Sequence, residues 1–115
     1  IAFRKKKDNY VDWFPDGNLN IYFNCVTSNI LKGLKKKIAI HYINKNKEFK
    51  SYSYKELDNI TINFSKLLTE KLKRKKKGNN SKVIIHGSSS MSTAVSMMAC
   101  AKLGIHFSVI LKISS

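Results

Sequence analysis

The stretch from Lys82 to Leu111 constrains the fold more than any other part of the sequence. A β-branched run at 82–87 is followed by an apolar segment at 91–103 and by a second apolar run at 105–111. This order predicts two parallel strands that are joined by a right-handed crossover helix. Gly104 stands where a left-handed C-terminal cap would close that helix. The pattern therefore predicts an α/β fold, but it does not indicate an activity.

Upstream of this stretch, the sequence predicts a β-hairpin that leads into a helix. The runs 37–43 and 49–54 are separated by four polar residues, so we expect an antiparallel pair of strands. Ser53 and Glu56 form a capping box, in which each side chain satisfies an amide at the start of a helix. The helix should therefore begin at Tyr54.

This helix should run to about Leu72 with one apolar face on a sheet and with Lys66, Lys71 and Lys73 in water. The order strand, strand, helix, strand, helix, strand then predicts a three-layer α/β arrangement with a mostly parallel sheet. The apolar stripe consists of Leu57, Ile60, Phe64, Leu67, Leu68 and Leu72.

The beginning of the chain has no sustained periodicity and contains the single proline, Pro15. We expect residues 1–36 to form an irregular N-terminal arm with a single helical turn and residues 37–115 to form the first α/β part of a domain. Trp13 and Phe14 are large apolar side chains, so they should anchor the arm on the α/β body.

The formal net charge of +15 suggests a second class of function, the binding of a nucleic acid or an anionic surface. However, 20 of the 22 basic residues are lysine, whereas phosphate and base recognition relies on the bidentate guanidinium of arginine. The basic run 71–77 is typical of a solvated helix C-terminus. We therefore expect no nucleic-acid partner, and a basic nucleic-acid or anionic-surface binding module remains the alternative function. Steeply salt-dependent binding to an oligonucleotide would distinguish that alternative.

Few residues have the spacing of a chemical site. Cys25 and Cys100 lack CxxC spacing, so reduced intracellular thiols are expected. His41, His86 and His106 have no ligand partners at suitable spacing, which predicts structural histidines. The three serines after the strand at Lys82 could cradle a phosphate, but a helix-capping loop suits their single glycine better.

No segment has the roughly 20 apolar residues of a membrane span, and no signal peptide is visible.

Residues 13–26, WFPDGNLNIYFNCV, resemble the opening motif of the AMP-forming acetyl-CoA and propionyl-CoA synthetases, W-F-x-x-G-x-L-N-x-x-Y-N-C-V. Three further segments resemble motifs of that family, in family order. Residues 52–57 are similar to T-Y-x-E-L, residues 77–83 to K-G-D-x-V, and residues 99–106 to A-C-A-R-L-G-A-I-H.

Two departures from the family pattern stand out. Asn80 and Ser81 lengthen the loop before the strand at Lys82, which costs little in a surface loop. The family has an aromatic residue and two glycines near the nucleotide end of CoA, where this chain has Leu111, Lys112 and Ile113. The resemblance leaves Lys112 as the candidate cofactor-binding residue, because its charge could meet an anionic ligand.

The resemblance implies an ATP-dependent ligase that adenylates acetate or propionate, releases pyrophosphate and transfers the acyl group to CoA. ATP, Mg and CoA are implied for the full-length enzyme, which would be a cytoplasmic or nucleocytoplasmic protein of fatty acid metabolism. The chain looks like the N-terminal portion of such an enzyme, with the remainder of the synthetase as its partner. It lacks the family's phosphate loop, adenylate-site motifs and C-terminal catalytic lysine. We therefore expect no catalytic or metal-binding residue in it, and the isolated chain should be inactive.

Overall fold

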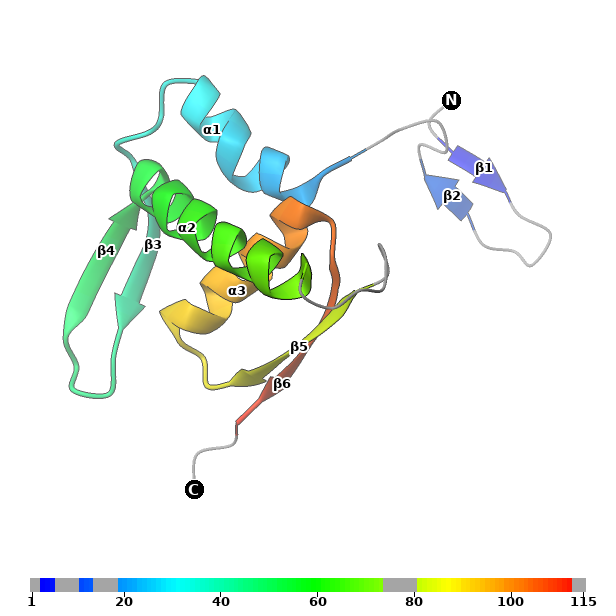
Figure 1. Cartoon of the computed structure of the whole chain (residues 1–115). Coiled ribbons are helices and arrows are strands. Elements are labelled where there is room, and N and C mark those ends of the chain that lie inside the picture. The colour runs from blue at the N-terminus through cyan, green and yellow to red at the C-terminus, as the bar shows by residue number, and fades with distance from the viewer. Residues whose placement is uncertain (1–2, 6–10, 14–18, 74–80, 113–115) are drawn as a thin grey trace.

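The computed structural model describes residues 3–5, 11–13, 19–73 and 81–112, which form three small sheets and a set of helices (Figure 1). The side chains of residues 3, 4, 11–13 and 73 lie outside the description. The elements are β1 (Phe3–Lys5), β2 (Val11–Trp13), the π-helix η1 (Phe23–Thr27), α1 (Ser28–Leu31), β3 (Ile38–Ile43), β4 (Phe49–Ser53), α2 (Tyr54–Lys73), β5 (Lys82–Gly87), α3 (Met91–Leu103) and β6 (His106–Leu111).

The β5–α3–β6 unit has the predicted form. β5 and β6 are parallel, with a register that runs from Lys82 opposite His106 to Gly87 opposite Leu111. Gly104 adopts a left-handed conformation, with φ of 69°, and caps α3. Of the thirteen residues of α3, all of which are described, only Ser92 and Leu103 are exposed. Helix α3 is therefore largely enclosed.

β3 and β4 form the predicted antiparallel hairpin. The turn is held by the Asn44 side chain, whose Oδ1 accepts hydrogen bonds from the amides of Asn46 and Glu48, each at 2.9 Å. Lys47 takes a positive φ of 61° in this turn. A polar turn of this kind fixes the pairing of the two strands because it returns the chain directly alongside itself.

Helix α2 begins at Tyr54 as predicted, and the amide of Glu56 donates to the Ser53 hydroxyl at 3.1 Å. Its buried face matches the prediction in part, because Leu57 is 4% exposed and Phe64 packs against the core. Ile60 and Leu67 are 37% and 51% exposed, whereas Thr61 and Ser65 are 0% and 4% exposed. The reason is that α2 packs against α3, where small side chains allow a close approach of the two helices. Lys66 and Lys71 are exposed as expected.

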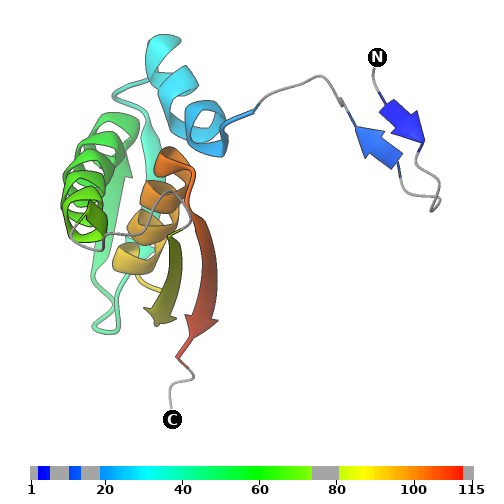
Figure 2. The same ribbon diagram turned by 45° about the vertical axis from the view of Figure 1, so that its right-hand side comes forward.

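The expected mostly parallel sheet is not observed among the described strands. They form three separate two-stranded sheets, of which β1–β2 and β3–β4 are antiparallel. In Figure 2, α3 lies between α2 and the β5–β6 pair, so the layers are helix, helix and sheet. One face of β5–β6 carries α3, and the opposite face has no helix over it in the described part of the chain.

The beginning of the chain contains more regular structure than the expected irregular arm. Residues 21–31 are helical, and Phe23–Thr27 form a π-helix at whose end the Ser28 amide donates to the Phe23 carbonyl. Tyr22 and Val26 of this segment join Leu57 and Val95 in the buried core. The arm is therefore anchored by its helical segment.

The expected anchor at Trp13 and Phe14 stays a prediction. The backbone of Trp13 pairs with Phe3 in the β1–β2 hairpin, and both views place that hairpin apart from the helices (Figures 1 and 2). The Trp13 side chain lies outside the description, as does all of Phe14 and Pro15.

Candidate functional site

Tyr22 occupies the junction between the helical segment 21–31 and the helices α2 and α3. It is 2% exposed, and its hydroxyl donates to Asp58 Oδ1 of α2 at 2.5 Å. The Lys102 ammonium of α3 lies 4.6 Å from the centroid of the Tyr22 ring, which is the geometry of a cation–π contact. Burial, together with the hydrogen bond to Asp58, holds the pKa of Tyr22 well above its ordinary value. The phenol is therefore a stable hydrogen-bond donor.

Asn20 supplies a second link at this junction. Its side-chain amide donates to the Ala101 carbonyl at 3.3 Å, and its side-chain oxygen accepts from the Phe23 amide at 3.0 Å. The second bond satisfies a free amide at the start of the helical segment, as an N-cap residue does. Asn20 thus starts this segment and ties it to α3.

Three of the four segments that carry the family resemblance meet at this junction. Tyr22 and Val26 come from the 13–26 motif, Leu57 closes the 52–57 motif, and Lys102 lies in the 99–106 motif. The fourth segment, 77–83, is described only from Ser81 onward. The sequence placed these motifs far apart, and the fold brings them around one core. Sequence reasoning did not predict this helical segment. The spacing of Tyr22, Val26 and Ile30, which follows one face of a helix, could have indicated it.

Lys112, the candidate cofactor-binding residue, lies at the carboxyl end of the parallel strands. Its amide donates to the Gly87 carbonyl at 2.6 Å, so it stands beside the loop that follows β5. The residue is exposed. In open α/β sheets, ligands bind in the crevice outside the carboxyl ends of the strands. Lys112 is therefore at the edge where a ligand contact is expected, and no described contact tests that role.

The serine loop between β5 and α3 uses its polar groups for capping. The Ser90 hydroxyl accepts from the Thr93 amide at 3.3 Å, and the Thr93 hydroxyl donates to the Ser88 carbonyl at 2.6 Å. A Cβ on Gly87 would lie 3.3 Å from the Thr93 hydroxyl oxygen, so glycine keeps this turn tight. The prediction of a helix-capping loop is confirmed.

The described histidines and cysteines do not form a metal site. His41 Nδ1 lies 2.9 Å from the Ser51 hydroxyl, and the rings of His41 and Phe49 stack at 5.2 Å. No group of three metal-ligating side chains occurs among the described residues.

In the same part of the chain, none of the helices combines the length and apolarity needed to cross a bilayer.

The fold and the junction define a mixed α/β segment whose motifs converge on one core. No family model matches the chain. The chain is 34% identical over 101 residues to the acetyl-coenzyme A synthetase of Cupriavidus metallidurans. It is 33% identical over 98 residues to that of Methylobacillus flagellatus and 29% identical over 101 residues to that of Streptomyces coelicolor.

These matches cover 85–88% of the chain and 14–15% of each relative. The chain thus spans about one seventh of the length of the acetyl-coenzyme A synthetases it matches. The resemblance to this family is confirmed, and the extent of the match is that of a fragment of such an enzyme.

Proposed function

We propose that this chain is the N-terminal scaffold portion of a short-chain AMP-forming acyl-CoA synthetase. The whole enzyme would convert ATP, CoA and acetate or propionate into acyl-CoA, AMP and pyrophosphate through an acyl-adenylate. ATP, Mg and CoA would be used by the whole enzyme in the cytoplasm or nucleocytoplasm. The similarity over 88% of the chain to acetyl-coenzyme A synthetases carries this proposal.

The proposed role of the chain itself is structural. The residues of the three convergent motifs are used in core packing, in a cation–π contact and in hydrogen bonds between helices. The hydrogen bond and the cation–π contact each join one helix to another. The chain would therefore position the rest of the synthetase, and Lys112 would be its one contribution to cofactor binding.

The uncovered face of β5–β6 supports the proposal of a larger, three-layer domain. This face exposes Ile84 and Ile110, at 69% and 53%. Parallel strands are normally covered on both faces by helices. In the whole enzyme, further elements of the large N-terminal domain would cover this face and extend the pair into a mostly parallel sheet.

A chimera tests whether this chain is equivalent to the matching segment of an active enzyme. The matching part of the Cupriavidus metallidurans synthetase is replaced by residues 13–112, and formation of acetyl-CoA from ATP, acetate and CoA is measured. We expect a folded chimera that retains activity. A second chimera with Tyr22→Ala should lose activity in parallel with its melting temperature. A chimera that melts like the parent enzyme but makes no acetyl-CoA would contradict the proposal.

A second experiment tests the inactivity of the isolated chain. Exchange of labelled pyrophosphate into ATP is measured with acetate or propionate, and we expect no exchange above background. Exchange that exceeds background and disappears with Lys112→Gln would show that the chain contains catalytic machinery.

A further inference from the structure

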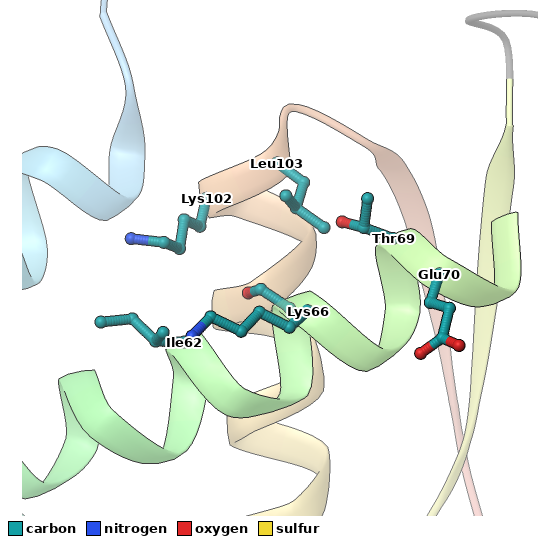
Figure 3. Close-up of a pocket in the computed structure, with 7 residues that line it drawn as sticks. Ile62, Lys66, Thr69, Glu70, Lys102 and Leu103 are labelled. Atoms are coloured by element: carbon teal, nitrogen blue, oxygen red, sulfur yellow. The ribbon is translucent and has the colours of Figure 1, made fainter. Parts of the chain in front are cut away.

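A pocket with a volume of about 410 Å³ lies between the C-terminal half of α2 and the last turn of α3 (Figure 3). This volume falls within the range of small-molecule sites, which is roughly 300–1,000 Å³. The pocket shares Lys102 with the Tyr22 junction, and none of its lining residues lies at the carboxyl edge of β5–β6. Its main walls are formed by Ile62, Ser65, Lys66, Lys102 and Leu103.

The charges around this pocket are separated along its length. Figure 3 shows the ammonium groups of Lys66 and Lys102 at the same end, near the helical segment 21–31, and the Glu70 carboxylate at the opposite end. Lys102 is held at this end by its contact with the Tyr22 ring. The C-terminus of α3 contributes about half a negative charge nearby, which two full positive charges exceed. This end of the pocket therefore favours an anion.

The lining of the pocket is mostly apolar, and Ser65 and Thr69 add hydroxyl groups. Ile62, Leu103 and the methylene stems of the two lysines supply the apolar surface. Ser65 is 4% exposed, and its hydroxyl has no hydrogen-bond partner among the described residues. A buried hydroxyl without a partner is unfavourable, and a ligand with a polar atom at this depth would relieve that cost.

We propose that this pocket binds a small organic anion with an apolar body, with its anionic group between Lys66 and Lys102 and its body against Ile62 and Leu103. This binding site goes beyond the proposed synthetase function and does not depend on it. Two cations at one end, apolar walls and one unpaired hydroxyl fit a ligand of this class. Inorganic phosphate would leave the apolar walls empty, and a neutral hydrocarbon would leave both cations without an anionic partner.

Naphthalene-2-sulfonate is a suitable probe, because its charge does not change with pH in the working range. Its neutral counterpart is naphthalene-2-sulfonamide, which has nearly the same shape. Binding to the 115-residue chain is followed by amide chemical shifts at constant salt. We expect saturable shifts at Ile62, Ser65, Thr69 and Leu103, with a Kd of about 1 mM from typical ligand efficiency. The sulfonamide should bind more weakly.

Three variants test the individual contacts. Lys66→Gln and Lys102→Gln should each weaken sulfonate binding about threefold and leave the sulfonamide unchanged, as for a partly exposed charge contact. Ser65→Ala should weaken both probes by about two- to tenfold. Lys71→Gln is the matched control, because Lys71 is an exposed lysine of α2 that does not line the pocket.

Lys66 is exposed and lies outside the core, so its variant should fold even if Lys102→Gln does not. Three results would each overturn the proposal. These are an absence of saturation well above about 1 mM, equal weakening by Lys66→Gln and Lys71→Gln, and shifts centred on Ile84 and Ile110 of the open sheet face.

Discussion

Ile84 and Ile85 are consecutive residues of β5 with the same side chain, yet they are 69% and 8% exposed. The difference is due to α3, which covers the Ile85 face of the β5–β6 pair and leaves the Ile84 face open. Identical side chains in one strand therefore contribute very differently to stability. The elements that cover a residue, rather than its side-chain type, decide how much it contributes to stability. Three pairs of consecutive residues allow this to be tested.

The largest difference is expected at Tyr22 and Phe23, which are 2% and 48% exposed. Tyr22→Ala should lower the free energy of unfolding by about 3–5 kcal/mol, because it removes a buried aromatic ring. Phe23→Ala should cost about 1 kcal/mol or less, since half of its surface is already in water. Urea unfolding of both variants measures the two effects. Equal losses would mean that Tyr22 is not a core residue.

The isoleucine pair should show a smaller difference. Ile85→Ala should cost about 2–4 kcal/mol through a cavity beneath α3, and Ile84→Ala should change stability by about 0.5 kcal/mol or less. The same urea titrations provide the measurement. A large loss for Ile84→Ala in the isolated chain would show that its face is covered after all, for example by a second copy.

The third pair is Ser89 and Ser90 in the loop before α3. Ser90→Ala removes the N-cap that accepts from the Thr93 amide and should cost about 1 kcal/mol. Ser89 is exposed, so Ser89→Ala should be nearly neutral. Thermal unfolding followed by circular dichroism is sufficient here. If both changes prove neutral, the hydroxyl of Ser90 does not stabilise the helix.

The smallest expected effect is a dependence of stability on pH. It distinguishes the contribution of the Tyr22 hydroxyl from that of its ring. Because the pKa of Tyr22 in the folded chain lies above its ordinary value of 10.0, its stabilising contribution is complete below pH 10 and declines as the pH rises further. Tyr22→Phe should therefore be less stable than the original chain at about pH 8, and the gap should narrow by about pH 11. A gap that stays constant would exclude this linkage.

Much of the local structure could be predicted from the sequence, because its signals are local. The polar turn at Asn44, the cap at Ser53 and the left-handed Gly104 each act through bonds to residues a few positions away. These signals set the ends of β3, α2 and α3 to within a residue or two. Predicting these ends required no knowledge of contacts with distant segments.

The buried face of α2 could be predicted only in part, since Leu57 and Phe64 pack as expected. Its apolar stripe suggested that Ile60 and Leu67 would pack, but contact with α3 selects the small side chains of Thr61 and Ser65 instead. The Tyr22 junction was missed because it joins residues 36 positions apart, Tyr22 and Asp58, whose pairing no local pattern encodes. The pocket beside Ser65 depends on the same helix contact and was missed for the same reason.

The junction also has a consequence for synthesis on the ribosome. Asn20 bonds to the Ala101 carbonyl, 81 positions later in the chain. At about 5–20 residues per second, the helical segment is made roughly 4–16 s before its α3 partner exists. During that interval Tyr22 and Val26 can pack against Leu57 of α2 but not against Val95 of α3, so the nascent chain presents a partly uncovered apolar segment to chaperones until α3 emerges. Slowing translation between residues 31 and 91 should therefore prolong chaperone association with the nascent chain.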